Sequence, residues 1–139
     1  MADNERTALL NVDADDAKRF PLSEMLRKEG FEVVEAANEA EALRLVKRNP
    51  DLVLLGVTLP NEEATRLCRR IKAAPATMSI PVLHLSAASV DDAARADRAD
   101  LGADGYLTYP VSPPVLIAYI KALLRRAHKA KTATGTRLA

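Results

Sequence analysis

The sequence predicts an α/β domain in which five strands form a parallel sheet and helices connect them. Short apolar segments recur along the chain, and segments with helical periodicity lie between them. This alternation favours a parallel sheet with right-handed crossover connections. The length of 139 residues suits one hydrophobic core, and we see no internal repeat that would indicate a second domain.

Five segments have the length and composition of strands. They are residues 7–12, 31–34, 51–55, 82–85 and 105–107. Segment 51–55 is apolar after its first residue, which is typical of a strand that is buried on both faces of a sheet. Pro81 directly precedes the fourth segment, and Gly30 precedes the second.

The first predicted helix covers residues 16–29. Its apolar spacing places Phe20, Met25 and Leu26 toward the core. Pro21 lacks a backbone donor and its ring clashes with the preceding turn. We therefore expect this helix to start late or to kink.

The other helices have clearer start signals. Asn38 followed by Glu41 resembles a capping box, and Ser112 before Pro113 supplies a capping hydroxyl and a proline in the first turn. Residues 90–101 predict a helix with a thin apolar stripe. Apolar positions at helical spacing are Ala40, Leu43 and Val46 in the second helix and Ala64, Leu67, Cys68 and Ile71 in the third.

The last helix carries more apolar surface than one core face needs. Its inward positions are Leu116, Tyr119, Ile120 and Leu123, and its stripe is widened by Val115, Ile117 and Leu124. Together these positions span roughly 200°, against the ~100° that core packing needs. We expect Val115, Ile117, Tyr119 and Leu124 to contact a partner or a second copy, unless a neighbouring part of the chain covers them.

Composition and charge exclude several classes of protein. Hydrophobic residues make up 48% and charged residues 28% of the chain, which is typical of a soluble globular protein. No apolar run reaches the roughly 18 residues of a membrane helix, and the polar first residues do not resemble a signal peptide. With one cysteine, Cys68, no internal disulfide forms, and we expect a cytoplasmic protein that does not bind membranes.

The net charge of +1 is unevenly distributed. From Lys121 onward the chain has six Lys or Arg residues and no acidic residue. We divide the chain into an N-terminal arm (1–6), a domain (7–127) and a flexible basic tail (128–139). The tail has no aromatic residue that would stack on bases, so we do not expect nucleic-acid binding.

The candidate site lies where parallel strands end. Ligands of open parallel sheets bind outside the carboxyl ends of the strands. In this sequence those ends are followed by Asp13, Gly56, Ser86 and the pair Tyr109–Pro110.

Four segments around these positions resemble the receiver domains of two-component response regulators. They are residues 11–16 (Asn-Val-Asp-Ala-Asp-Asp), 52–60 (Leu-Val-Leu-Leu-Gly-Val-Thr-Leu-Pro), 81–87 (Pro-Val-Leu-His-Leu-Ser-Ala) and 102–111 (Gly-Ala-Asp-Gly-Tyr-Leu-Thr-Tyr-Pro-Val). The resemblance covers residues 7 to 126. It implies a doubly wound, flavodoxin-like fold with five helices and the strand order 2-1-3-4-5.

The resemblance also implies a phosphorylation site, from which this sequence departs. Receivers have an acceptor aspartate after the third strand, and here that position is Gly56. The second residue of the Mg²⁺-binding acidic pair is Ala14, and the lysine before Pro110 is Tyr109. Asp13 and Ser86 keep the family's residue types.

The sequence therefore predicts a degenerate receiver that is not an enzyme. Phosphoryl transfer depends on positioned groups and charge neutralisation, and glycine has no nucleophile. Asp13 alone is a weak metal candidate, so we expect weak or absent Mg²⁺ binding and no cofactor. Expected partners are a sensor histidine kinase, a response regulator or a second copy. The alternatives are phosphorylation at an unusual residue such as Thr58 or Glu62, or a regulatory domain from a hybrid histidine kinase.

Single residues also have plainer interpretations. Asp13 would cap the following helix, and Ser86 would either act as a switch or bond backbone donors of the next helix. His84 and Cys68 would be core residues, with Cys68 inert. Tyr109 would fill the space left by the missing carboxylate.

Overall fold

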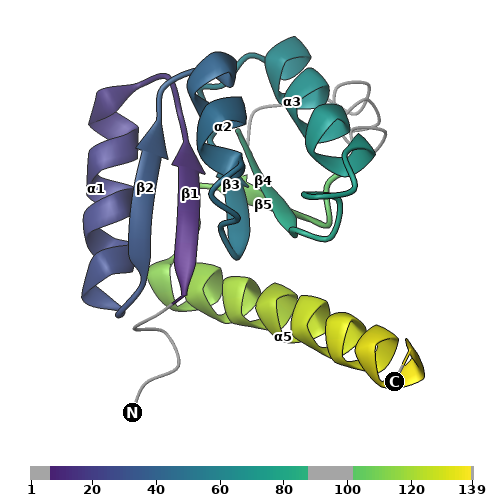
Figure 1. The fold of residues 1–139 in the computed structure, drawn as a ribbon. Coiled ribbons are helices and arrows are strands. Elements are labelled where there is room, and N and C mark those ends of the chain that lie inside the picture. Colours follow the sequence, from purple (N-terminus) through teal and green to yellow (C-terminus); the bar gives the residue numbers. More distant parts are fainter. Residues whose placement is uncertain (1–6, 88–101, 139) are drawn as a thin grey trace.

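The computed structural model describes residues 7–87 and 102–138, with side chains as far as His128. Its parallel sheet has the strand order β2-β1-β3-β4-β5 (Figure 1), the order that the resemblance implied. The strands are β1 (Ala8–Val12), β2 (Glu32–Ala36), β3 (Leu52–Leu55), β4 (Val82–Ala87) and β5 (Gly105–Tyr109). The five predicted strands are confirmed, with small changes at their ends.

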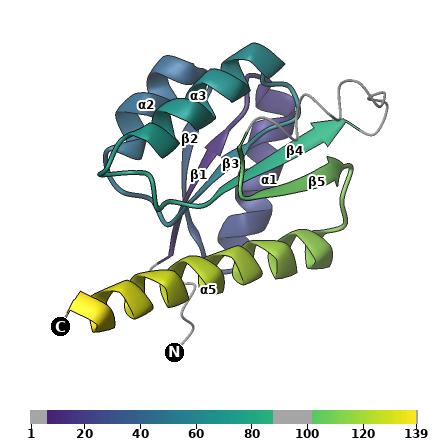
Figure 2. The ribbon, with the colours of Figure 1, turned by 90° about the vertical axis from the view of Figure 1, so that its right-hand side faces the viewer.

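Helices cover both faces of the sheet (Figure 2). The described helices are α1 (Asp16–Lys28), α2 (Glu39–Val46), α3 (Asn61–Ala73) and α5 (Pro113–Leu138). Helices α1 and α5 lie on one face, and α2 and α3 lie on the other. The helix predicted at 90–101 falls outside the described residues. Among the helices that are described, none combines the length and the hydropathy needed to cross a bilayer.

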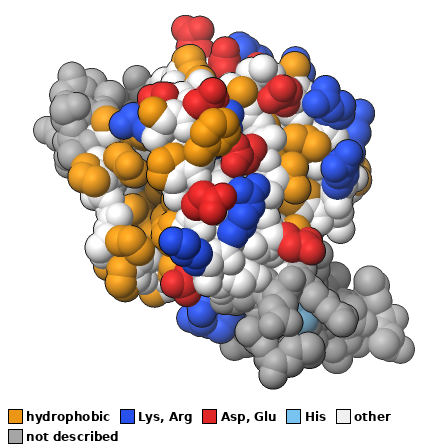
Figure 3. Space-filling model, turned by 90° about the vertical axis from the view of Figure 1, so that its left-hand side faces the viewer, with side chains coloured by type: hydrophobic (Ala, Val, Ile, Leu, Met, Phe, Trp, Pro, Cys, Tyr) orange, Lys and Arg blue, Asp and Glu red, His pale blue; other side chains and the backbone are white. Residues whose placement is uncertain are grey.

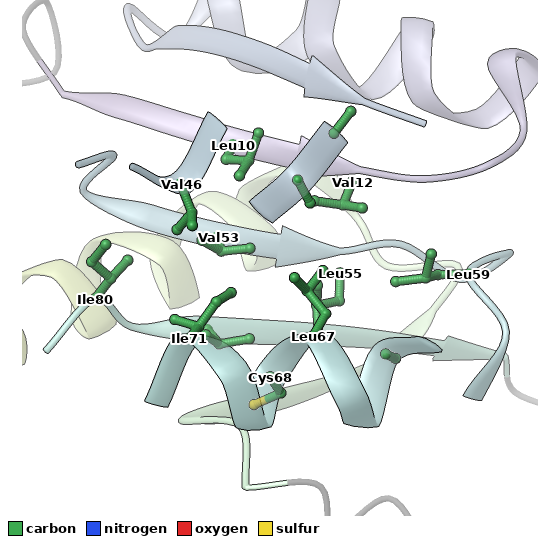
Figure 4. Close-up of a cluster of buried hydrophobic side chains, with 14 residues drawn as sticks. Leu10, Val12, Val46, Val53, Leu55, Leu59, Leu67, Cys68, Ile71 and Ile80 are labelled. Carbon is green, nitrogen blue, oxygen red and sulfur yellow. The ribbon is translucent and has the colours of Figure 1, made fainter. Parts of the chain in front are cut away.

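The sheet separates two hydrophobic clusters because alternate residues of a strand point to opposite faces. Leu52 and Leu54 of β3 belong to the cluster under α1 and α5. Val53 and Leu55 belong to the cluster under α2 and α3 (Figure 4). Strand β3 is therefore buried on both faces, as its apolar sequence predicted.

The inward face of α1 is partly polar, which corrects the prediction for Phe20, whereas Leu26 is buried as predicted. Phe20 is 50% exposed, while Arg19, Ser23 and Leu26 are buried. The reason lies in β1, where Asn11 points toward α1. Its Nδ2 donates to Ser23 Oγ at 3.0 Å and to the Arg19 carbonyl at 3.2 Å. Polar groups on the helix thus accept both hydrogen bonds of the Asn11 amide nitrogen, and Phe20 turns outward.

Helix α1 does not start late. It begins at Asp16, and Pro21 lies within it. Asp15 is the N-cap, and its Oδ1 accepts a hydrogen bond from the Ala17 N–H at 3.0 Å. A side-chain acceptor at the N-cap stabilises the first turn by satisfying a free backbone donor, so the helix starts ahead of the proline.

The predicted capping of α2 is present with one difference. Asn38 Oδ1 accepts from the Glu41 N–H at 2.9 Å, and Glu41 Oε1 accepts from the Ala37 N–H at 2.7 Å rather than from Asn38. Val46 is buried and Leu43 packs against the core as predicted, but Ala40 is exposed and Ala42 is buried in its place. The cap sets the rotation of the helix about its axis, and this rotation brings Ala42 to the core.

The predicted core stripe of α3 is confirmed, since Ala64, Leu67, Cys68 and Ile71 are all buried. Burial raises the pKa of the Cys68 thiol to about 11, so the thiol stays protonated and unreactive at neutral pH. His84 of β4 is buried and packs edge-on to Tyr106, with ring centroids 6.1 Å apart. Cys68 and His84 are therefore both core residues, as predicted.

Helix α5 buries a wider arc than predicted. Leu116, Ile120 and Leu123 are buried, and Ile117 is also only 8% exposed. The prediction that Ile117 lies at the outer edge is wrong. Ile117 joins the cluster that contains Leu26 of α1 as well as strand leucines, so α5 packs into more than one element.

The C-terminal part of α5 covers the segment that the sequence analysis assigned to a tail. The sequence placed the end of the domain at residue 127 and a flexible tail after it. In the structure α5 continues as one helix to Leu138. Its second half extends past the amino ends of the strands (Figure 2).

Candidate functional site

Four of the predicted site residues meet at the carboxyl edge of the sheet. Val12 and Leu55 are paired across β1 and β3, so Asp13 and Gly56 directly follow paired positions. The Gly56 N–H donates to the Val12 carbonyl at 2.6 Å. On the other side, β4 and β5 pair Ser86 with Thr108 and Ala87 with Tyr109. Parallel pairing thus brings together side chains that are far apart in sequence.

Asp13 lies against the backbone of Gly56. A Cβ added at Gly56 would stand 2.6 Å from Asp13 Cγ and 2.7 Å from Asp13 Cβ, with Oδ2 nearer still. Real Cβ atoms essentially never make contacts this short. The side chain of Asp13 therefore fills the space in front of the acceptor position. The atoms nearest to the Cβ position belong to Asp13, and the interpretation that Tyr109 fills the space of the missing carboxylate stays a prediction.

Asp13 is the most buried carboxylate of the site, with 3% of its surface exposed. Its Oδ1 accepts a hydrogen bond from the Asp15 N–H at 3.0 Å. Burial raises the pKa of Asp13, although this hydrogen bond and the charges of Lys18 and Arg19 oppose the rise. Asp13 thus orders the turn before α1, while the N-cap itself is Asp15, which corrects the prediction that Asp13 caps the helix.

The two neighbouring acids take up helix positions. Asp15 is half-buried at the N-cap, and Asp16 is exposed in the first turn. Thr58, from the loop after β3, accepts a hydrogen bond from the Asp15 N–H at 3.2 Å through its Oγ1. This contact ties the loop of the missing acceptor to the start of α1. Glu62 is exposed in the first turn of α3.

A buried arginine, Arg19, connects the site to β2. Its Nη1 donates to the Asp13 carbonyl at 2.6 Å, and its Nε donates to Glu35 Oε1 at 2.8 Å. Its Nη2 donates to Asp16 Oδ1 at 2.5 Å. The guanidinium therefore places a fixed positive charge beside the acidic turn of residues 13–16. The sequence analysis missed it, because an arginine in an amphipathic helix is ordinarily assigned to the exposed face.

A second cation lies on the other side of the site. Lys18 Nζ is 5.3 Å from the centre of the Tyr109 ring, a cation–π geometry. Tyr109 holds the position at which receivers have lysine, so an ammonium group is still present nearby, supplied by α1. The Tyr109–Pro110 peptide bond is cis, and Pro110 is exposed. Ala14 is exposed and adds no ligand.

Ser86 lies in β4 and is buried. The helix whose donors it was expected to bond falls outside the described residues, so that alternative stays a prediction. In the described part of the chain, no three Asp, Glu, His or Cys side chains gather closely enough to hold a metal ion. The charged groups that act on Asp13 are the half-buried Asp15 and the cations Lys18 and Arg19. This set is poor in the oxygen ligands that Mg²⁺ requires.

The chemistry available at this site is limited. The acceptor position has no side chain, the nearest carboxylate is held in a turn, and the positive charges are on protein side chains. A carboxylate nucleophile at Gly56 would need Asp13 to move first. The arrangement holds β1, β3 and α1 together.

The sequence of the chain is similar to a known protein family and to several characterised proteins. The family model described as response regulator receiver domain matches residues 9–121. The transcriptional regulatory protein GltR of Pseudomonas aeruginosa is 39% identical over 140 residues, which cover 100% of this chain and 57% of GltR. The phosphate regulon transcriptional regulatory protein PhoB of the same species is 38% identical over 119 residues, covering 85% of this chain and 52% of PhoB. The chain thus spans just over half the length of these relatives.

Solved structures of the same family have a similar fold. A putative response regulator from Chloroflexus aurantiacus superposes with a TM-score of 0.77 at 36% identity, covering 86% of this chain and 98% of that one. The receiver domain of a signal transduction histidine kinase from Syntrophus aciditrophicus gives a TM-score of 0.78 at 29% identity, covering 86% and 91%.

Proposed function

Since the chain belongs to the response regulator receiver domain family, we propose that it is a pseudo-receiver that works without phosphorylation. It acts by binding proteins in bacterial two-component signalling and does not catalyse a reaction. The observation that carries the proposal is the contact between Asp13 and Gly56. The acceptor side chain is missing, and the space in front of it is already filled.

The metal and charge environment supports the same function. Phosphoryl transfer in this family needs a divalent cation to neutralise the developing charge. Here Arg19 and Lys18 supply positive charge beside Asp13 instead. We propose that Mg²⁺ binds weakly or not at all, and that the site keeps one conformation.

The proposed partners are a sensor histidine kinase, another response regulator or a second copy. The exposed surface has apolar groups for such contacts. On the side of the molecule that α1 covers, hydrophobic side chains gather in one region beside mixed charges (Figure 3). Val115 of α5 is 51% exposed, whereas Ile117 is buried and unavailable. A dimer through α5 would therefore use Val115 together with the half-buried Tyr119 and Leu124.

A phosphodonor experiment tests the proposal. The protein is incubated with acetyl phosphate and Mg²⁺, and its intact mass is measured beside an active receiver that has the acceptor aspartate. We expect no adduct of phosphoryl mass on this chain and a clear adduct on the control. Millimolar Mg²⁺ should leave the melting temperature nearly unchanged, since a ligand stabilises only in proportion to its binding.

The second candidate is a receiver phosphorylated at another residue. Thr58 supports it, because its hydroxyl lies in the acceptor loop beside Asp15. A stoichiometric adduct that maps to Thr58, and that is lost in Thr58→Val, would establish this candidate and overturn the pseudo-receiver.

A further inference from the structure

A cleft of about 90 Å³ opens at the amino ends of β3 and β4, at the opposite end of the sheet from Asp13 and Gly56. Its walls come from the loop before β3, the loop before β4 and α5. Of the nine described residues that line it, five are apolar, namely Pro50, Ile80, Pro81, Leu124 and Ala127, and four are polar, namely Asn49, Asp51, Ser79 and His128. At about 30 Å³ per water molecule, it has room for some three waters or for a small branched side chain.

The rim of this cleft is basic. His128 lines it, and exposed Arg125 lies three residues earlier on α5. Exposed Lys47 and Arg48 precede the loop that forms the opposite wall. The acidic residue of the lining, Asp51, accepts a hydrogen bond from the Ala8 N–H at 2.8 Å through Oδ2. Among the described residues, the three Lys and Arg side chains near the cleft therefore outnumber the acid, which already has a partner.

The positive charge of this end follows from the fold. Helices α1, α2 and α3 all end at the amino edge of the sheet, and their last turns contain Arg27, Lys28, Arg44, Arg70 and Lys72. Their first turns contain Asp16, Glu39, Glu41, Glu62 and Glu63. This distribution complements the helix dipoles. Some of these cations form ion pairs, Arg27 with Glu24, Arg70 with Glu39 and Lys72 with Asp104. The helix ends therefore add only part of their positive charge to the edge with the cleft.

We propose that this cleft docks an acidic segment of a partner protein. One aliphatic side chain of the segment enters the cleft, and its carboxylates face Arg125, His128 and the Lys47–Arg48 pair. Burial of the aliphatic group supplies affinity, and the charges supply orientation and a fast association rate. The proposal deepens the pseudo-receiver function, on which it rests, because it names the chemistry of a partner.

The features of the cleft favour a protein segment over nucleic acid. Among the described residues that line the cleft there is no Phe, Tyr or Trp, so this lining offers no large aromatic platform for stacking a base. The aliphatic lining instead matches an aliphatic side chain. The cleft is also remote from the degenerate phosphorylation site, so docking there needs no phosphorylation switch.

Two pairs of variants test the proposal on the whole chain. Ala127→Leu fills the cleft from α5, and Ala122→Leu adds the same atoms at an exposed position on the other side of the helix. Arg125→Glu reverses a charge of the rim. Arg126→Glu makes the same change about 100° further round the helix, away from the cleft. Circular dichroism and melting curves confirm that each variant is folded.

The probe is a fluorescein-labelled peptide, Asp-Glu-Leu-Glu-Asp, and its binding is followed by fluorescence anisotropy at low salt. Matched peptides have Ala in place of Leu, or Lys in place of every acidic residue. We expect a dissociation constant at or below about 1 mM, with weaker binding of both matched peptides. Ala127→Leu should abolish binding, and Arg125→Glu should weaken it about two- to fivefold. Ala122→Leu and Arg126→Glu should bind like the wild type.

Three results would overturn the proposal. The first is that the acidic peptide does not bind, and the second is that all four variants bind it equally. The third is that a DNA duplex displaces the peptide from the cleft, which would identify a nucleic-acid site. None of these measurements depends on phosphorylation, so failure here differs from failure of the pseudo-receiver, which an adduct at the acceptor loop would reveal.

Discussion

The side chain of Asp13 occupies the space in which any side chain at position 56 would begin. Its Cγ lies 2.6 Å from the point where a Cβ at Gly56 would stand. The observed conformation of Asp13 is therefore compatible only with a residue that has no side chain at position 56. The loss of the acceptor side chain is thus coupled to the conformation of Asp13 in the turn before α1.

This coupling predicts a cost for Gly56→Ala. Overpacking of a filled site destabilises a protein by about 1–3 kcal/mol, and we expect a loss in that range by urea denaturation. In the background of Asp13→Ala, which removes Cγ and both oxygens, the cost of Gly56→Ala should be smaller by at least about 0.5 kcal/mol. Equal costs in the two backgrounds would show that the two residues do not interact.

Reconstruction of the receiver site should need several changes. We expect Ala14→Asp, Gly56→Asp and Tyr109→Lys together to regain Mg²⁺ binding and some phosphorylation by acetyl phosphate. Gly56→Asp alone should do little, because the second acid and the lysine are still absent. Intact-mass time courses follow the phosphorylation of the single and the triple variant. A single variant that is phosphorylated as fast as the triple variant would contradict the expectation that all three groups are needed.

The burial of Asp13 predicts a pH dependence. Its pKa in the folded state is raised above the ordinary value of 3.8, chiefly by burial. The folded state therefore binds this proton more tightly than the unfolded state does, and ionisation of Asp13 destabilises the fold at neutral pH. As the pH falls through the raised pKa toward 3.8, this penalty is relieved.

Asp13→Asn tests this dependence. The amide oxygen still accepts from the Asp15 N–H but carries no charge. We expect a higher free energy of unfolding than wild type at pH 7, and a difference that shrinks toward pH 4 in parallel urea titrations. A variant that is less stable at pH 7 would mean that the negative charge of Asp13 stabilises the site.

Arg19 should be important for stability. Arg19→Met removes bonds to the Asp13 carbonyl and to Glu35, and leaves these groups without that donor. We expect a loss of about 2–3 kcal/mol, below the 3–5 kcal/mol of fully buried pairs because Asp16 is exposed. Arg27→Met removes more exposed contacts, with Glu24, Glu35 and the Val33 carbonyl, and should cost less, about 1 kcal/mol. Similar losses for the two variants would contradict the buried network.

Two neighbouring positions on α5 should respond in opposite ways. Val115→Glu places a charge on an exposed site near the helix N-terminus, so stability should change by no more than about 0.5 kcal/mol. Ile117→Glu buries a carboxylate among leucines and should unfold the domain. Melting curves distinguish the two. If α5 forms a dimer, Val115→Glu should also weaken self-association in sedimentation experiments.

The sequence alone determined the order of the elements and the position of the site. Apolar runs such as 51–55 and start signals such as Asn38 are local properties, and they predicted the strands and most helix starts. The identity of Gly56 is equally local, because a missing nucleophile is evident from one residue. The resemblance then placed Asp13, Ser86 and Tyr109 at the same edge of the sheet, where parallel pairing brings them together.

Tertiary structure decided what surrounds each of these residues. Arg19 points inward because Asn11 on β1 provides a polar neighbour, and Ile117 is buried because the cluster at α5 includes α1 as well as the sheet. Asp13 fills the space at Gly56 because two strand ends meet there. These outcomes depend on packing and hydrogen bonding between segments that are distant along the chain, and periodicity within one segment carries no information about them.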